Sequence, residues 1–278
     1  MSALDVEAPA ASRERADAGA DASPMISLRN IRRTFRSPRG DDVTTVLKGV
    51  DFSAPAGSFN VIRGESGSGK TTLLRVLGML DSGYDGSYAL GGTEVSGRPD
   101  WWLDEVRAAN IGFIFQDGQL LAHMTLADNI AAPVRLLGDE AQRRSAADDV
   151  AGAAPVFFTQ AELSSGLLNA KPTLASGGQK QRAAVMRSIV HQPCVILADE
   201  PTASLDAERK QEIRSLLMQM CEAGHTVVVV THDSLFFDVG RQFEMVKGRL
   251  EDAPPGTPVA ADETIDAPRP RIPEGGAG

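Results

Sequence analysis

The stretch from Gly64 to Thr71 contains residues whose types and spacing could bind phosphate. A glycine, four further residues and then Gly-Lys-Thr follow one another in Gly64-Glu65-Ser66-Gly67-Ser68-Gly69-Lys70-Thr71. In a loop of this pattern, backbone N–H groups surround the phosphates of a nucleotide, the lysine reaches the β- and γ-oxygens, and the hydroxyl meets Mg²⁺. The pattern therefore predicts a nucleotide-binding loop with Lys70 and Thr71 as its principal side chains.

The segments on either side of this loop support that interpretation. Residues 58–63 are typical of a strand, and residues 72–80 are typical of a helix. Bound phosphates would then lie at the N-terminus of a helix that begins near Thr72, where the helix dipole favours anions. A Gly/Ser linker that happens to contain lysine is the alternative, and the flanking strand and helix disfavour it.

A pair of acidic residues, Asp199 and Glu200, follows the apolar segment 194–198. Beside a phosphate-binding loop, the first carboxylate at such a strand end can hold Mg²⁺ through water, and the second can polarise the water that attacks the γ-phosphate. Paired acids at the end of a strand also occur as a solvated turn. The loop upstream favours the catalytic interpretation.

Two other positions have both a structural and a functional interpretation. Ser176, Gly177 and Gly178 precede a helix predicted over 179–190, so they form either a second anion site at a helix N-terminus or a plain helix-start turn. His232 comes just after four consecutive valines, where a buried strand emerges. A histidine there is either a hydrogen-bonded structural residue or a catalytic one.

Strands and helices alternate along most of the chain. Strands are predicted at 26–31, 44–52, 58–63, 87–90, 111–115, 194–198 and 226–230, with a closing segment at 242–250, and helices at 72–80, 101–109 and 207–223. Such long alternation with Val- and Ile-rich strands predicts an α/β fold, in which helices cover a parallel or mixed sheet.

The region 117–190 has a different character. Helices are predicted there at 126–137, 140–152 and 179–190, separated by Pro133, Gly138, Pro155, Pro172 and Gly177-Gly178, and no convincing strand intervenes. The simplest account is an α-helical subdomain inserted into the α/β core.

The two ends of the chain differ from its body in composition. Residues 1–24 are Ala-rich, acidic and aperiodic, which predicts a disordered arm, and residues 252–278 carry many Pro and Gly residues, which predicts a flexible tail. Of the formal net charge of −9, the first 23 residues contribute −3 and residues 251–278 contribute −4. The folded body, residues 25–251, is therefore nearly neutral, and nucleic acid is not an expected partner.

The sequence also indicates the cellular compartment of the protein. The longest apolar runs are far shorter than the roughly 18 residues that span a bilayer, and the N-terminus lacks the basic-then-apolar pattern of a secretory signal. Cys194 and Cys221 are the only cysteines and lack metal-like spacing, which favours a reducing compartment. We expect a cytoplasmic protein that reaches a membrane only through a partner.

Several motifs in their order along the chain resemble those of the ATP-binding subunits of ABC transporters. The resemblance covers about residues 25–251. It includes the phosphate loop, and it matches the Q-loop at Gln116, the signature at Ala175-Ser176-Gly177-Gly178-Gln179, the second nucleotide motif at Asp199-Glu200-Pro201-Thr202, the D-loop at Ala203-Ser204-Leu205-Asp206 and the switch histidine at His232.

The resemblance implies a role for each matching residue. It implies a P-loop NTPase (RecA-like) core with an N-terminal antiparallel β subdomain, and ATP and Mg²⁺ as cofactors. Glu200, His232, Gln116 and Lys70 would be catalytic, and Thr71, Gln116 and Asp199 would hold the metal. Phe35 would stack on adenine, with a core aromatic as the alternative, while Gly64 to Thr72, Ser176 to Gln179 and Asp206 would complete the nucleotide site.

The resemblance also implies partners. In this family the signature of one subunit closes on the nucleotide of another, so a head-to-tail homodimer is expected in the ATP-bound state. Phrases such as Gly78-Met79-Leu80-Asp81 are similar to the exporter branch that serves lipoprotein release, macrolide efflux or FtsX-like permeases. The expected function is an ATPase that drives a separate FtsX/MacB-like membrane permease from the inner face of the membrane, in export or mechanotransmission.

The sequence leaves two alternative functions open, and it departs from the family's usual motifs at some positions. The chain could be an FtsE-like regulatory ATPase that signals through a permease-like partner, or a soluble ABC ATPase associated with DNA or ribosomes. Ala175 replaces the usual Leu of the signature, and Met186-Arg187-Ser188-Ile189 replaces a common Ala-Arg-Ala-Leu type of run. These departures bear on partner fit and coupling more than on ATPase chemistry.

Overall fold

The computed structural model describes residues 24–36, 43–116, 118–137, 165–203 and 205–254. Its strands are β1 (Ile26–Arg36), β2 (Val43–Ala54), β3 (Phe59–Arg63), β4 (Asp85–Leu90), β5 (Thr93–Glu94), β6 (Ile111–Ile114), β7 (Val195–Asp199), β8 (Thr226–Val230), β9 (Arg241–Val246) and β10 (Arg249–Asp252). Its α-helices are α1 (Lys70–Leu77), α2 (Asp100–Asn110), α3 (Leu126–Leu136), α5 (Ser165–Leu168), α6 (Gly177–Ile189) and α7 (Ala207–Glu222). Two short 3₁₀ helices, η1 (Pro172–Leu174) and η2 (Ser234–Phe236), complete the described elements.

A six-stranded sheet forms the centre of the molecule, in the order β10-β9-β3-β8-β7-β6. Its pairs are parallel except for the antiparallel pair of β9 and β10. Val230 pairs with Ile62 on one side and with Asp199 on the other, so β3, β8 and β7 end at the same level. The segments that follow these three strands therefore emerge together at one edge of the sheet, the usual place for a ligand in an α/β fold.

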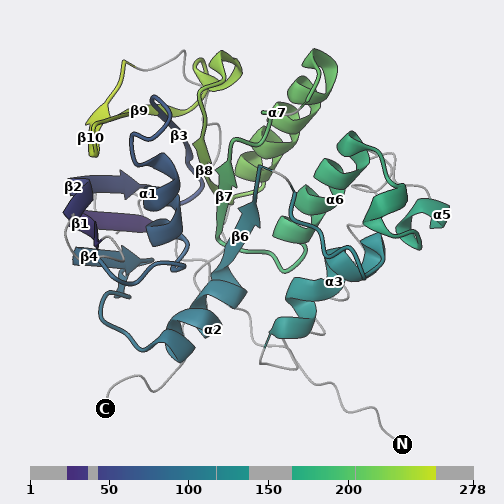
Figure 1. Ribbon diagram of the computed structural model, residues 1–278, viewed down its shortest axis with the longest axis horizontal. Helices are drawn as coiled ribbons and strands as arrows, with labels where there is room; N and C mark the ends of the chain where they lie inside the picture. The colour runs from purple at the N-terminus through teal and green to yellow at the C-terminus, as the bar shows by residue number, and fades with distance from the viewer. Residues whose placement is uncertain (1–23, 37–42, 117, 138–164, 204, 255–278) are drawn as a thin grey trace, which may run out of the picture.

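A second, four-stranded antiparallel sheet contains the N-terminal strands in the order β2-β1-β4-β5. It lies beside α1, at the end of the molecule that β9 and β10 also approach (Figure 1). Both the parallel core and this antiparallel sheet confirm the fold class that the sequence predicts.

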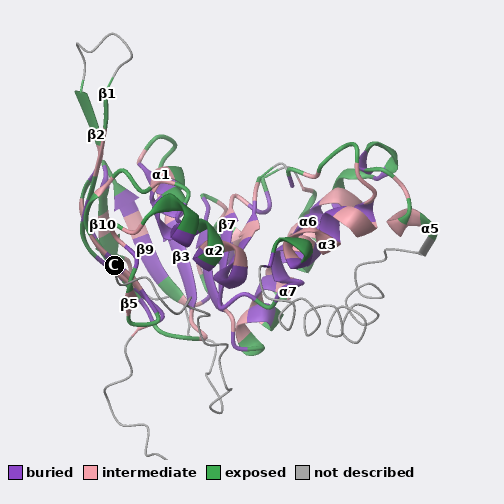
Figure 2. Cartoon of the chain, turned by 90° about the horizontal axis from the view of Figure 1, so that it is seen from below, coloured by how far each residue is buried: buried purple, intermediate pink, exposed green. Residues whose placement is uncertain are grey.

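Two apolar clusters hold these layers together, one on each face of the central sheet. Val228 and Val230 belong to the cluster that packs with α1 and the antiparallel sheet, whereas Val227 and Val229 belong to the cluster with α3, α6 and α7. Successive side chains of a strand point to opposite faces, so a run of four valines serves both clusters. Figure 2 shows the central strands as largely buried.

The helices α3, α5 and α6 lie together on the opposite side of the central sheet from β1, β2 and β4 (Figure 1). Leu126, Ile130 and Val134 recur at helical spacing on α3 and join the apolar cluster that contains Ala183 and Met186 of α6. No strand lies among the described residues between Gly118 and Ile189. The boundaries of a helical subdomain at about 117–190 remain a prediction.

Several boundaries differ from those expected. The helix after the phosphate loop begins at Lys70, two residues before the predicted start, because the turn ends at Gly69 in a left-handed conformation and Leu73 already donates to Gly69. Helix α3, in contrast, ends within one residue of its expected end at 137: it continues past Pro133, whose missing N–H removes one helical hydrogen bond, since the buried apolar stripe continues to Val134. The two-residue strand β5 after Gly91-Gly92 was not expected.

Other differences concern element length. The first strand continues to Arg36 rather than ending at Ile31, with register shifts along its pairing with β2. The expected closing segment is two strands, β9 and β10, that form a hairpin. The predicted helix 140–152, the N-terminal arm and the tail beyond Pro254 lie outside the described residues. Within the described residues, no helix is long and apolar enough to cross a membrane.

Candidate active site

One cleft of about 770 Å³ collects most of the residues that the sequence singles out. It lies at the edge of the sheet where β3, β7 and β8 end. Twelve of the expected site residues line it, together with Val46 from β2: Gly64, Glu65, Ser66, Gly67, Gly69, Lys70, Thr71, Thr72, Gln116, Asp199, Glu200 and His232.

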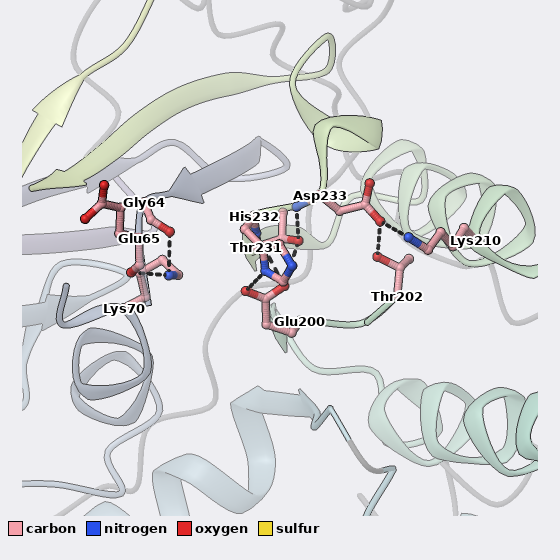
Figure 3. A network of polar contacts seen from close by, with 9 residues as sticks. All are labelled: Gly64, Glu65, Lys70, Glu200, Thr202, Lys210, Thr231, His232 and Asp233. Atoms are coloured by element: carbon pink, nitrogen blue, oxygen red, sulfur yellow. Dashed lines mark hydrogen bonds and ion pairs between the residues drawn. The ribbon is translucent and has the colours of Figure 1, made fainter. Parts of the chain in front are cut away.

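The loop between β3 and α1 forms one wall of this cleft. Lys70 donates from its Nζ to the carbonyl oxygens of Gly64 (2.7 Å) and Glu65 (2.8 Å), so the lysine spans its own loop (Figure 3). Gly64 has a positive φ of 150°, and a Cβ there would lie 2.5 Å from the carbonyl oxygen of Met245. The loop therefore packs closely against β9, and only glycine fits at this contact.

Asp199 ends β7 and faces α1 across the cleft. Burial, the largest effect, raises the pKa of its carboxyl, while a hydrogen bond from Thr71 and the positive charge of Lys70 oppose that rise. The adjacent Glu200 carboxylate raises the pKa of Asp199 further. The surroundings therefore disfavour a negative charge at Asp199, and a cation bound beside it would relieve that cost.

Glu200 and His232 form a hydrogen-bonded pair at the ends of β7 and β8. The Glu200 Oε1 lies 2.8 Å from His232 Nδ1, and its Oε2 accepts hydrogen bonds from the Thr231 hydroxyl (3.0 Å) and the His232 backbone N–H (3.3 Å), as Figure 3 shows. The His232 side chain is 72% exposed, whereas that of Glu200 is 15% exposed. The carboxylate is therefore fixed, and the imidazole remains open to a ligand.

The backbone of Glu200 is itself unusual. Its φ is +46°, in the left-handed region that non-glycine residues rarely adopt. Its N–H donates to the carbonyl oxygen of Val230 at 2.8 Å, which continues the pairing of β7 and β8 by one residue. Backbone strain of this kind is common at functional sites, where it aims a side chain.

Sequence reasoning missed a polar cluster behind this pair. Asp233 accepts hydrogen bonds at its Oδ2 from Lys210 Nζ (2.7 Å) and from the Thr202 hydroxyl (3.0 Å) (Figure 3). Burial raises the pKa of Asp233, but the hydrogen bonds from Lys210, Leu235 and Thr202 lower it overall. Its position next to the candidate switch histidine was the available signal, but nothing in the sequence placed Lys210 beside it.

The residues of the candidate signature lie apart from the cleft, at the N-terminus of α6. Ser176 is the N-cap: its hydroxyl accepts from Gln179 N–H (3.3 Å), and Gln179 Oε1 accepts from Ser176 N–H (2.9 Å). This reciprocal capping box confirms the helix-start turn without excluding an anion site. Ser176, Gly177 and Gln179 do not line the cleft of their own chain, and neither does Gly178, which packs near Arg209.

Three other expected residues also lie outside the lining of the cleft. Asp206 is the N-cap of α7 and accepts a hydrogen bond from the Arg209 N–H at 3.0 Å. Phe35 is 41% exposed, with the Arg33 guanidinium 4.3 Å from its ring centroid, so it is not a core aromatic. Ser68 is the third: it belongs to the phosphate loop but does not line the cleft, and its backbone carbonyl accepts a hydrogen bond from the Gly248 N–H at 3.0 Å.

The arrangement combines backbone N–H groups and a lysine at a helix N-terminus with a carboxylate held by a histidine. Such a set of groups can bind a polyphosphate and orient a water molecule for attack on it. The hydroxyl of Thr71, the carboxylate of Asp199 and the amide of Gln116 offer oxygen atoms, which are the ligands that Mg²⁺ prefers.

Comparisons with known proteins identify the family of the chain. A model of the family described as ABC transporter matches residues 47–203, which include the loop, Gln116, Ser176 and the acidic pair. The chain is 35% identical over 244 residues to the macrolide export ATP-binding/permease protein MacB of Salmonella paratyphi A, and 38% identical over 254 residues to the protein of that name from Bordetella avium. These matches cover 87% and 89% of this chain, but the chain spans only 36% and 37% of the relatives' length.

Solved structures of an ATP-binding cassette are similar as well. Two dimeric structures of MJ0796, described as a bacterial ABC transporter cassette, match with TM-scores of 0.70 and 0.69 and 33% identity. Each match covers 82% of this chain and 98% of the other, and the first of these structures is a post-hydrolysis state bound to ADP and Pi. The family and the fold predicted from the sequence are thereby confirmed: the chain belongs to the ABC transporter family, as an ATP-binding cassette.

Proposed function

We propose that the chain binds ATP with Mg²⁺ in the cleft beside Lys70 and hydrolyses it, and that this cycle drives a separate membrane permease. The observation that carries the proposal is the convergence of the phosphate loop, Asp199, Glu200 and His232 on one cleft. These groups come from segments as much as 168 residues apart, Gly64 to His232, and they meet because their three strands end at one level.

Each group has a distinct role in the proposed reaction. Lys70 and the N–H groups of the loop bind the β- and γ-phosphates, and Glu200 accepts a proton from the attacking water. His232 contacts the γ-phosphate with its exposed imidazole while its Nδ1 stays within hydrogen-bonding distance of Glu200. Gln116 reaches the same region from the segment that follows β6.

The metal would be held by Thr71 and Asp199, with Gln116 nearby. The fit rests on the oxygen donors of these three side chains and on the burial that raises the pKa of Asp199. Bound Mg²⁺ would neutralise charge that develops on the phosphate oxygens. The residues of the chain would then orient the nucleotide and the attacking water.

A second copy of the chain is part of the proposal. Ser176 and Gly177 are exposed at the N-terminus of α6 and do not line the cleft of their own chain. A helix N-terminus of this kind suits a phosphate, so the exposed signature would complete the cleft of another copy. The dimeric state of MJ0796 supports this arrangement.

The permease would contact a groove of about 590 Å³ beside Gln116. Apolar side chains from β6, the residue after it and α3 contribute much of its lining, including Phe113, Phe115 and Leu136, together with Leu80. Leu136 is 74% exposed and Leu80 is 46% exposed, which is unusual for large apolar side chains that lie close together.

The relatives named for macrolide export favour a transporter over a DNA- or ribosome-associated ATPase. The cassette would then lie at the cytoplasmic face of the membrane.

The ATPase proposal is tested by Lys70→Ala and Glu200→Gln. Loss of the lysine should weaken ATP binding in a direct titration and reduce turnover by on the order of 10²-fold or more. Glu200→Gln keeps the shape of the side chain but removes the base, so ATP should bind while hydrolysis is lost. Hydrolysis by Glu200→Gln at the parental rate would exclude Glu200 as the base.

The partner proposal is tested by purification from detergent-solubilised membranes. The parental chain should be recovered with an integral-membrane permease, and Leu136→Glu should reduce that recovery because it places a charge in the apolar groove. Val43→Glu, at an exposed apolar residue on β2, is the matched control. Recovery with ribosomes or DNA in place of a permease would contradict the proposal.

A further inference from the structure

Lys210 connects the first turn of α7 to the segment that carries His232. Its Nζ lies 2.7 Å from Asp233 Oδ2, and the same oxygen accepts from the Thr202 hydroxyl at 3.0 Å. Its backbone N–H donates to Asp206, so Lys210 belongs to the start of the helix. Figure 3 shows Lys210 and Thr202 on one side of Asp233, with Thr231 and His232 on the other.

A continuous series of hydrogen bonds leads from Asp233 to the catalytic pair. The N–H of Asp233 donates to the Thr231 hydroxyl oxygen (3.0 Å), and this hydroxyl donates to Glu200 Oε2 (3.0 Å). The other carboxylate oxygen of Asp233 accepts from Leu235 N–H (3.1 Å) and so fixes the start of η2. The segment 231–235 is therefore held on both sides of His232.

The ion pair itself is partly buried. The side chains of Lys210 and Asp233 are 32% and 17% exposed, so water screens their attraction less than at an open surface. A second ion pair on the same helix, Arg214 with Asp238 at 2.8 Å, has a carboxylate that is 65% exposed. That pair lies one turn further along α7 and reaches the segment beyond η2, away from Thr231.

The first turn of α7 also touches the candidate signature. A Cβ at Gly178 would lie 2.9 Å from Arg209 Nε, so the residue before Lys210 packs against the start of α6. Two consecutive residues of α7 therefore contact the signature on one side and the segment after β8 on the other. A shift of this turn would therefore change the contacts both at the start of α6 and at the segment after β8.

We propose that Lys210 is a positioning residue for ATP hydrolysis: through Asp233 it holds the segment 231–235 so that His232 and Glu200 keep their places at the cleft. The inference rests on the proposed function, and it extends the site to a residue that does not line the cleft. Lys210 acts on turnover and leaves nucleotide binding to the phosphate loop.

The test compares Lys210→Met, Lys210→Arg and the control Arg214→Met in the full-length chain. Methionine keeps the length of the side chain without the charge, and arginine restores the charge. We expect Lys210→Met to lower kcat roughly 3- to 10-fold with KM for ATP within about twofold, and Lys210→Arg to recover most of the loss. Arg214→Met should leave kcat within about twofold of the parent.

Hydrogen exchange supplies a readout that does not depend on hydrolysis. The amides of Asp233 and Leu235 donate to Thr231 and Asp233, so Lys210→Met should make them exchange faster, while Arg214→Met should not. Unchanged exchange and unchanged kcat in Lys210→Met would overturn the inference, and so would an equal loss of kcat in Arg214→Met. If the parent itself hydrolysed no ATP, the proposed function would fail, while the exchange result would still decide whether Lys210 holds this segment.

Discussion

Asp199 is the residue whose surroundings point most directly to a ligand. Its pKa is raised because burial disfavours the carboxylate, and Glu200 adds to the effect, while Thr71 and Lys70 oppose it. A raised folded-state pKa means that the folded chain binds the proton more tightly than the unfolded chain. The stability linked to this proton is therefore present at low pH and lost as the pH rises through the folded-state pKa.

Asp199→Asn should accordingly raise the melting temperature of the nucleotide-free chain at pH 7, because the cost of the buried charge is removed. The gain should shrink as the pH falls through the folded-state pKa of Asp199 and should be absent below the pKa of an unfolded aspartate, about 3.9. The same variant should bind MgATP at least about tenfold more weakly, because one of the proposed oxygen ligands loses its charge. Melting curves with and without MgATP, across pH, measure both effects. A lower melting temperature of Asp199→Asn at pH 7 would show that the charge at Asp199 does not destabilise the folded chain.

Single residues of the site were predictable to different degrees. The phosphate loop and the acidic pair could be found because local spacing defines them, and twelve of the expected residues line one cleft. Val46 could not be found, since it reaches the cleft only through the way β2 lies beside the loop. Lys210 and Asp233 are 23 residues apart, and their contact depends on the packing of α7. The roles of Phe35 and Asp206 remain predictions.

At the scale of elements, the hairpin of β9 and β10 supports the phosphate loop. Gly248 donates its N–H to Ser68 and accepts at its carbonyl from Lys48 N–H, so the turn joins the loop to β2. Its φ is +86°, and a Cβ there would lie 2.2 Å from the carbonyl oxygen of Val46. Gly97 has a similar φ of +72° but nothing within 4 Å of the corresponding Cβ position.

These two glycines form a matched pair of tests. Gly248→Ala should destabilise the chain by about 2–4 kcal/mol, because it adds a backbone clash to an unfavourable φ. Gly97→Ala introduces only the unfavourable φ and should lower the free energy of unfolding by about 1 kcal/mol. Gly248→Ala should also weaken ATP binding, since the loop loses its support. Chemical denaturation measures the difference, and equal losses in the two variants would show that the contact with Val46 is unimportant.

The N-terminus of α6 offers a separate test of the signature. A side chain at Gly177 would meet nothing within 4 Å in the single chain, and an acidic residue at a helix start is favourable. Gly177→Asp should therefore keep the stability of the chain within about 0.5 kcal/mol. Its ATPase activity should fall by on the order of 10²-fold, because the new charge repels the phosphates.

Unfolding curves and turnover together decide this test. A folded Gly177→Asp variant with parental activity would mean that this surface meets no nucleotide.

Elements were predictable where periodicity was strong, as for the valine strand β8, which matches its expected bounds. Boundaries failed where a turn or a tertiary contact decided them, as at Lys70 of α1 and at Arg36 of β1.

At the scale of the whole molecule, the single chain contains two candidate phosphate surfaces that do not meet. The cleft holds Lys70, whereas the exposed signature residues Ser176 and Gly177 lie at the start of α6, on the opposite side of the central sheet from β1, β2 and β4 (Figure 1). The separation could not be read from the sequence, because it depends on how α6 packs against α3. We propose that a complete site needs a second copy, and this is the central claim to be tested.

The most direct measurement mixes two inactive variants. Lys70→Ala lacks the loop lysine but keeps its signature, and Gly177→Asp keeps the lysine but blocks its signature. In a head-to-tail dimer of one copy of each, one of the two sites contains both intact halves. Equal mixing should therefore restore about a quarter of the parental ATPase activity per chain. Activity no greater than that of the separate variants, despite formation of mixed dimers, would contradict the composite site.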